Sequence, residues 1–220
     1  MKKLAEVTPA VEPSLWEICE KYIKAELQGE ELEMKPYYEE KLLGDIMEHG
    51  EMNEEFAARA FDIYEAARKD KPDAILVECS TIGDVSRYAK PLYELMGIKL
   101  IALDAPAAEK AVSLGKRIGM VCNLHTTLGP SERLLYECAK EQNKEIEVII
   151  GYKKAFGMGE EALKNGIYET CKELEKKCDV LFLAQPSMTK WADWLRTEIS
   201  IPIVDVLPTA AKEVKRVLFG

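Results

Sequence analysis

Cys79 is the residue whose type and position point most directly to chemistry in this chain of 220 residues. It follows the expected strand at 74–78, whose apolar run at 74–77 is typical of a buried strand, and Ser80 and Thr81 come directly after Cys79. In open parallel sheets, ligands bind at the carboxyl ends of the strands. Backbone N–H groups and the dipole of a following helix favour negative charge there, which lowers the pKa of a thiol. We therefore predict that Cys79 is the functional centre.

The other five cysteines have positions that indicate packing. Cys19, Cys138, Cys171 and Cys178 fall within expected helices, and Cys122 ends an apolar strand. The sequence has no C-x-x-C pair and only two histidines, so it offers neither a redox pair nor the ligand spacing of a zinc site. We expect reduced, buried thiols and no bound metal.

Polar residues also follow three other expected strands. Thr8 follows the first strand, Asn123, Thr126 and Thr127 follow the strand at 117–122, and Gln185 and Ser187 follow the strand at 180–184. Thr126 and Thr127, before Gly129 and Pro130, read as a helix N-terminus whose hydroxyls and N–H groups could also bind a carboxylate. His125 lies in the same turn, where it is either a general acid or base or a solvated loop residue.

Strand and helix patterns alternate along nearly the whole chain. The apolar cores of the strands at 74–78 and 180–184 are continuous, which suits strands covered on both faces. Alternation of the two element types implies right-handed parallel βαβ units. Strands are expected at 3–7, 31–35, 74–78, 99–103, 117–122, 146–150, 180–184 and 202–206, and helices at 13–27, 53–69, 87–96, 107–114, 131–142, 159–177, 189–198 and 209–219.

An internal repeat divides the chain. Residues 73–82 match residues 179–188, so that Cys79 corresponds to Gln185 at an offset of 106, and residues 106–112 match residues 208–214. The fold class predicted is α/β, with two pseudo-symmetric parallel-sheet (flavodoxin-like) domains from an internal duplication. The first domain is expected at 1–98 plus 206–220 with Cys79, and the second at 99–205 with Gln185. The irregular stretch 28–52 is either a lid carrying Tyr37 and Tyr38 or a surface excursion with a short helix.

Composition excludes several classes of protein. The net charge of −9 argues against a nucleic-acid binder, which would show a clustered basic face. No apolar run is long enough to cross a bilayer. The N-terminal residues 1–4 lead into charged sequence and not into a signal-peptide core, so we expect a cytoplasmic protein with no membrane partner.

These features resemble the aspartate/glutamate/hydantoin racemase superfamily along nearly the full chain. The resemblance rests on Glu78-Cys79-Ser80-Thr81, on residues 121–127, on residues 183–188 and on the closing strand at 201–205. It implies a cofactor-independent isomerase, often a homodimer, with a cleft between two domains. In most members two cysteines lie on either side of the substrate α-carbon and exchange its proton. Cys79 matches the first of them, and Gln185 stands where the second is expected.

The sequence therefore predicts a racemase-superfamily enzyme that acts at the α-carbon of a small carboxylic acid, an amino acid or a derivative, with Cys79 as acid or base. The alternatives are a single-thiol decarboxylase or lyase of the same fold, or a non-catalytic protein that binds a small acid. An amide is neither a useful acid nor a useful base near neutral pH, so a two-thiol mechanism is in doubt. The expected substrate-binding residues are Thr8, Ser80, Thr81, Asn123, Thr126, Thr127 and Ser187.

Overall fold

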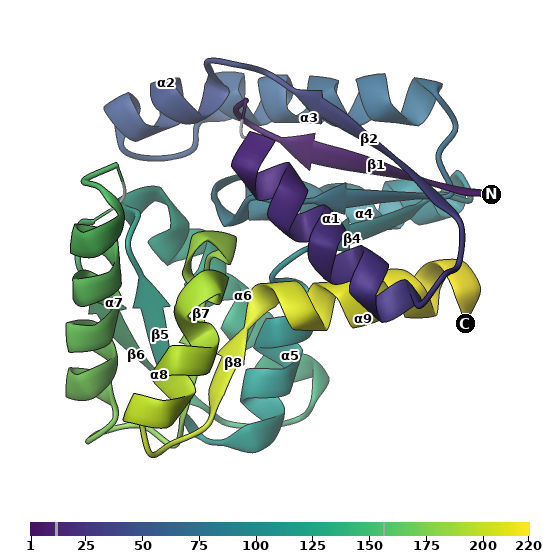
Figure 1. Cartoon of the computed structure of the whole chain (residues 1–220). Coiled ribbons are helices and arrows are strands. Elements are labelled where there is room, and N and C mark those ends of the chain that lie inside the picture. Colours follow the sequence, from purple (N-terminus) through teal and green to yellow (C-terminus); the bar gives the residue numbers. More distant parts are fainter. Residues whose placement is uncertain (12, 156) are drawn as a thin grey trace. The chain divides into compact units, whose positions relative to one another are not determined.

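Two four-stranded parallel sheets, each flanked by helices, form the framework of the molecule (Figure 1). The computed structural model describes residues 1–11, 13–155 and 157–220. The strands run in the orders β2-β1-β3-β4 and β6-β5-β7-β8, so the second sheet repeats the order of the first. The predicted α/β fold with two duplicated parallel sheets is confirmed.

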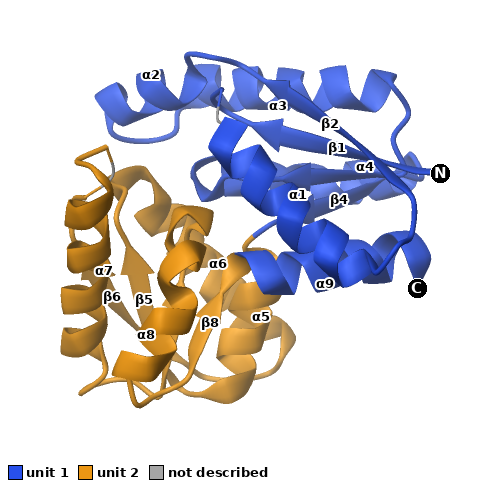
Figure 2. Cartoon of the chain, viewed as in Figure 1, with its two compact units in different colours: residues 1–103, 207–220 blue, residues 104–206 orange. Residues whose placement is uncertain are grey.

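The chain divides into two compact units (Figure 2), residues 1–103 with 207–220 and residues 104–206. Unit 1 contains β1 (Lys2–Thr8), α1 (Pro13–Leu27), β2 (Leu32–Tyr38), α2 (Leu42–His49), α3 (Glu54–Lys69), β3 (Ala74–Val77), the 3-10 helix η1 (Ser80–Ile82), α4 (Gly83–Leu95), β4 (Lys99–Ala102) and all but the first residue of α9 (Val206–Phe219). Unit 2 contains α5 (Ala105–Leu114), β5 (Arg117–Cys122), η2 (His125–Thr127), α6 (Leu128–Glu141), β6 (Glu147–Tyr152), α7 (Glu160–Leu174), β7 (Val180–Leu183), η3 (Pro186–Trp191), α8 (Ala192–Glu198) and β8 (Ile203–Asp205).

The expected domain boundary at 98/99 needs correction at β4. This strand pairs in parallel with β3, with Ala74 opposite Lys99 and Val77 opposite Ala102. Residues 99–103 therefore belong to unit 1, whereas the sequence assigned them to the second domain. An internal match cannot place a strand that lies at the end of one repeat and before the start of the next.

Alternate residues of β1 and β3 enter two different layers of unit 1. Ala5, Val7, Ile75 and Val77 pack with apolar residues of α2, α3 and α4, and the half-buried Cys79 packs against the same core. Successive strand residues point to opposite faces, so Glu6, Leu76 and Glu78 face the other layer. That face is the one to which α1 belongs, because Cys19 of α1 acts on the ionisation of Glu78.

Unit 2 repeats this division. Val121 of β5 and Leu181 and Leu183 of β7 pack with apolar residues of α7 and α8. Asn123 and Gln185, two residues beyond Val121 and Leu183, are directed to that same layer by the strand alternation. The carboxyl ends of β5 and β7 therefore present polar residues beside the α7 and α8 layer.

The segment 28–52 contains a short helix, as the second of its two sequence-based descriptions expected. β2 extends to Tyr38, and α2 follows it, so only short connections remain irregular. The hydroxyl of Tyr37 donates a hydrogen bond of 2.5 Å to Asp70, and the ring of Tyr38 lies 5.4 Å from that of Trp16. Both tyrosines are strand residues, which excludes a tyrosine-bearing loop in this structure.

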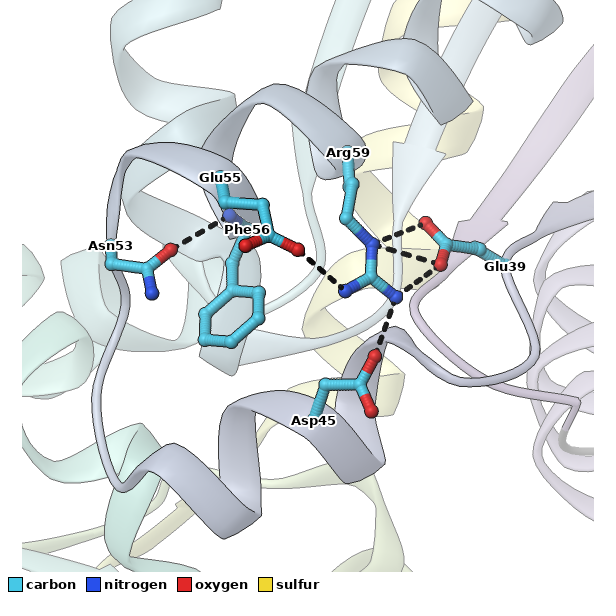
Figure 3. A network of polar contacts seen from close by, with 6 residues as sticks. All are labelled: Glu39, Asp45, Asn53, Glu55, Phe56 and Arg59. Atoms are coloured by element: carbon cyan, nitrogen blue, oxygen red, sulfur yellow. Dashed lines mark hydrogen bonds and ion pairs between the residues drawn. The ribbon is translucent and has the colours of Figure 1, made fainter.

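Arg59 of α3 holds α2 and the end of β2 in place (Figure 3). Its Nε donates to Glu39 at 2.9 Å, its Nη2 to Asp45 of α2 at 2.7 Å, and its Nη1 lies 3.6 Å from Glu55. The Arg59 side chain is 23% exposed, so these charges are partly shielded from water. Because α2 packs on the core that Cys79 contacts, Arg59 also supports the surroundings of Cys79.

Replacement of Arg59 by Ala is expected to loosen α2 and to lower the free energy of unfolding by about 1 kcal/mol, since partly exposed ion pairs contribute little more. Hydrogen exchange measured by mass spectrometry should show faster exchange in α2. The matched control is Arg216→Ala in α9, whose side chain is 70% exposed and pairs with Glu213. Unchanged protection of α2 in Arg59→Ala would show that this network does not hold the helix.

Candidate active site

Cys79 lies directly after β3 and precedes η1, with extended backbone angles φ −138° and ψ 119°. It is the only one of the six cysteines that is partly exposed; the other five, all within the described residues, are buried. The strand end and the start of η1 and α4 place the Cys79 thiol where an open parallel sheet binds its ligands. The position predicted from the sequence is therefore confirmed, while its catalytic role stays a prediction.

The buried cysteines are poor candidates for a thiolate. Burial raises the pKa of Cys122, Cys138 and Cys171 to about 12. It also raises the pKa of Cys19 and Cys178 above the usual value. Thiols with such pKa values stay protonated near neutral pH and do not act as nucleophiles or bases. We therefore assign these five cysteines to core packing, as the sequence led us to expect.

Thr8, Ser80 and Thr81 meet Cys79 at one edge of the first sheet. β1 and β3 are neighbours, and the N–H of Glu78 donates to the carbonyl of Val7 at 2.9 Å. Thr8 is buried, and its hydroxyl donates to the carbonyl of Ala10 at 2.7 Å. Ser80 and Thr81 are buried as well. The structure thus brings these four residues together in unit 1.

Gln185 occupies in unit 2 the place that Cys79 has in unit 1. Each residue follows the four-residue strand at the third position of its sheet and precedes a 3-10 helix, and the backbone angles of Gln185 are φ −138° and ψ 140°. The side-chain Oε1 of Gln185 accepts a hydrogen bond of 2.8 Å from the N–H of Asn123. This bond ties the end of β7 to the end of β5. Sequence patterns did not reveal it, because it joins residues that are 62 positions apart.

Several polar side chains near Gln185 are buried without a hydrogen-bond partner among the described residues. They are both polar atoms of Asn123 and the hydroxyls of Ser187 and Thr189. Leaving a buried polar group unsatisfied costs about 1–3 kcal/mol, so such groups need an explanation. A bound polar ligand or ordered water would supply the hydrogen bonds. Thr189 is a site candidate that sequence reasoning missed, although its small hydroxyl type, two residues after Ser187, was a usable signal.

Thr126, Thr127 and His125 form the turn η2 after β5. Thr126 and Thr127 are buried. The predicted helix N-terminus is confirmed, because Thr127 is the N-cap residue of α6. The Thr127 hydroxyl donates to the carbonyl of Leu124 at 2.7 Å and makes no cap hydrogen bond to the helix that follows. The adjacent η2 turn provides that carbonyl acceptor. His125 is exposed and lies edge-on to Tyr152, with ring centroids 6.0 Å apart.

Lys35 of β2 and Arg87 of α4 each form an ion pair with an acidic side chain. Lys35 pairs with Asp70, and Arg87 pairs with Asp84. Within the described part of the chain, no group of three or more histidine, cysteine or acidic residues is arranged to hold a metal ion. No helix in that part has the length and apolar character required to span a membrane.

The family model for Asp/Glu/Hydantoin racemase matches residues 37–214, which is most of the chain. The chain belongs to this family. The matched region includes Cys79 and Gln185, and thus both equivalent strand ends of the racemase-family fold. No curated protein sequence matches the chain.

Solved structures of racemases have the same fold as this racemase-family chain. Allantoin racemase from Klebsiella pneumoniae is 14% identical, with a TM-score of 0.66, and the match covers 99% of this chain and 87% of that one. Glutamate racemase from Bacillus anthracis is 17% identical, with a TM-score of 0.70, covering 98% of this chain and 81% of that one. An arylmalonate decarboxylase is 10% identical, with a TM-score of 0.57, covering 99% of this chain and 93% of that one. At such low identities the comparison establishes the fold of this family member and leaves its substrate open.

Proposed function

We propose that this racemase-family chain is an enzyme that moves a proton at the α-carbon of a small carboxylic acid, with Cys79 as the acid or base. The observation that carries the proposal is the exposure of Cys79. It is the one partly exposed thiol, and it lies at the carboxyl end of a central strand where small hydroxyl residues and helix N-termini gather. An amino acid or a derivative of one is the substrate class that fits the family.

Gln185 determines what kind of proton transfer this chain can perform. A second thiol at that position would protonate the other face of the substrate, whereas an amide cannot exchange a proton near neutral pH. The Gln185 Oε1 atom also accepts the Asn123 N–H, which leaves the Nε2 group as a donor. We therefore propose chemistry in which Cys79 supplies or removes the proton on one face only.

Hydrogen-bond donors are required because proton removal next to a carboxylate places negative charge on its oxygens. A preorganised donor at such an oxygen contributes about 3–4 kcal/mol to transition-state stabilisation. We propose Thr8, Ser80 and Thr81 in unit 1 for this role, through side chains or backbone N–H groups. In unit 2, Asn123, Thr126, Thr127 and Ser187 are the proposed donors, and the absence of partners for Asn123 and Ser187 among the described residues supports this assignment.

A second candidate reaction is decarboxylation, in which the carbanion left by loss of CO2 takes its proton from the Cys79 thiol. The replacement of the expected second cysteine by Gln185 favours it, because this reaction needs a proton donor on one face only. Both reactions are cofactor-independent and use the same thiol. They differ in the substrate, since decarboxylation requires a second carboxylate on the α-carbon.

The test is to incubate the enzyme with single enantiomers of candidate amino acids and derivatives in deuterated water, and with disubstituted malonates. We expect deuterium at the α-carbon with retained configuration, or CO2 release with one enantiomer formed. Exchange accompanied by full racemisation would show that a second group serves the opposite face and would contradict the one-face mechanism. If neither exchange nor CO2 release occurs and the acids raise the melting temperature, the proposed enzymatic function is wrong and the protein is a non-catalytic binder of small acids.

A further inference from the structure

Two glutamate side chains are buried side by side within unit 1. Glu6 lies on β1 and is 3% exposed, and Glu78 follows β3 and is fully buried. In the strand register Glu6 is opposite Leu76, and Glu78 is two residues further along, so both carboxyl groups emerge on the same face of the sheet. Cys19 of α1, which is 1% exposed, lies against them. We call Glu6 and Glu78 the carboxyl pair.

The carboxyl pair has no cation that could hold both groups ionised. Within the described residues, both carboxyl groups are buried, and the side-chain hydrogen bonds that act on their ionisation come from each other and from the Cys19 thiol. A buried carboxylate in this situation takes up a proton, because desolvation penalises the charged form. Burial, followed by the neighbouring charge of Glu6, raises the pKa of Glu78 well above its usual value. Burial is also the main cause that raises the pKa of Glu6 to about 7.

The charged groups around the carboxyl pair do not cancel the increase in pKa that burial causes. On α1, Glu20 raises the pKa of Glu6 and Lys24 lowers it, with burial outweighing both. Lys24 is itself paired with Glu20 at 2.6 Å. On α9, Lys215 donates to the carbonyl of Glu26 at 2.9 Å, on the last turns of α1. From β1 and α1, the groups that act on Glu78 are Glu6 and Cys19.

We propose that Glu6 and Glu78 act as a protonated carboxyl pair that keeps α1 packed on the face of the sheet formed by β1 and β3, and that releases this packing when it ionises. Glu78 immediately precedes Cys79, and its N–H donates to Val7 of β1, so the pair belongs to the strand end that carries the thiol. Hydration of an ionised Glu78 draws this strand end toward water. The inference is independent of the reaction that Cys79 performs.

The sign of the pH dependence follows from the raised pKa values. An acid whose pKa is higher in the folded than in the unfolded protein contributes stability that is fully present below the unfolded value and is lost as the pH rises through the folded value. For Glu6 this window lies between 4.5 and about 7. The raised pKa of Glu78 gives a pH dependence of the same sign. The melting temperature should therefore fall by several degrees as the pH rises from about 5 through the folded-state pKa of Glu6, about 7.

The experiment uses the whole chain, with Glu78→Gln and Glu6→Gln as variants that are neutral at every pH. Glu33→Gln is the matched control, because Glu33 lies in the same sheet on β2 but is exposed. Two readouts are followed against pH: the melting temperature, and the alkylation rate of Cys19 relative to Cys171, a buried thiol of unit 2. The ratio of the two rates cancels the general effect of pH on thiol reactivity.

In the wild type and in Glu33→Gln, we expect this ratio to rise by about tenfold or more at alkaline pH, the factor that one pKa unit corresponds to. In the two pair variants the ratio should stay constant, and the melting temperature should lose its alkaline decline. An equal decline in Glu78→Gln and wild type would overturn the proposal. Should a variant fail to fold, infrared spectroscopy of the wild type decides. A protonated carboxyl band that titrates well above the usual carboxyl range is required, and its absence contradicts the proposal.

Discussion

The Cys79→Ser variant should lose α-carbon deuterium exchange, or CO2 release, by a factor of about 10²–10⁴. The hydroxyl of serine is too weak an acid to ionise near neutral pH, so it cannot replace the thiol as the proton-transfer group. The substitution changes one half-buried atom, and we expect the circular dichroism spectrum and the melting temperature to stay close to the wild-type values. The expected loss of activity would therefore result from the missing proton-transfer group and not from misfolding.

Cys138→Ala is the control for this variant. Cys138 is a buried thiol of α6 whose pKa burial raises to about 12, so it has no acid-base function near neutral pH. We expect its removal to leave the exchange rate within about threefold of the wild type, and to cost stability only. Equal losses in both variants, or an unchanged rate in Cys79→Ser, would remove Cys79 from the mechanism.

The largest expected loss of stability belongs to Phe182→Ala. Phe182 is the middle of β7, has no exposed surface and lies opposite Val204 of β8 and Met120 of β5 in the sheet. Removal of a buried aromatic ring leaves a cavity that close-packed neighbours fill only in part. The free energy of unfolding should fall by about 3–5 kcal/mol, measured by urea denaturation.

Tyr136→Ala provides the comparison, since Tyr136 is an aromatic residue of α6 in the same unit and is 47% exposed. Its removal should change the free energy of unfolding by no more than about 0.5 kcal/mol. The strand β7 leads directly into Gln185, so exchange at the Gln185 and Asn123 amides should accelerate in Phe182→Ala and not in Tyr136→Ala. A loss below about 1 kcal/mol for Phe182→Ala would mean that the second sheet is not packed as described.

The fold could be predicted from the sequence wherever local residue patterns determine the secondary structure. The helix expected at 13–27 has those bounds in the structure, because its apolar residues recur with helical spacing and Pro13 suits a helix start. The strands at 74–78 and 180–184 were identified from continuous apolar runs, and their match exposed the duplication. The position of Cys79 at a strand end followed from the same runs.

Other features escaped prediction for physical reasons. A short helix within 28–52 was one of two expectations, but its bounds could not be predicted, because α2 contains Gly44 and its position depends on contacts with Arg59 that are distant in sequence. The helix α4 begins at Gly83, four residues before the predicted start. Glu6 and Glu78 look like solvent-facing residues in sequence, because a carboxyl side chain normally marks the exposed side of a strand. Only the tertiary structure shows that α1 covers them.

Native-state alkylation tests the central claim, that Cys79 is the reacting thiol, most directly. The folded protein is treated with limiting iodoacetamide, the modified cysteines are mapped by peptide mass spectrometry, and residual exchange activity is measured at each time point. We predict that Cys79 is modified at least about tenfold faster than any of the other five cysteines, since only its thiol is partly exposed, and that activity falls in proportion to that modification. Modification of another cysteine at a similar rate, or full activity after complete modification of Cys79, would contradict the account.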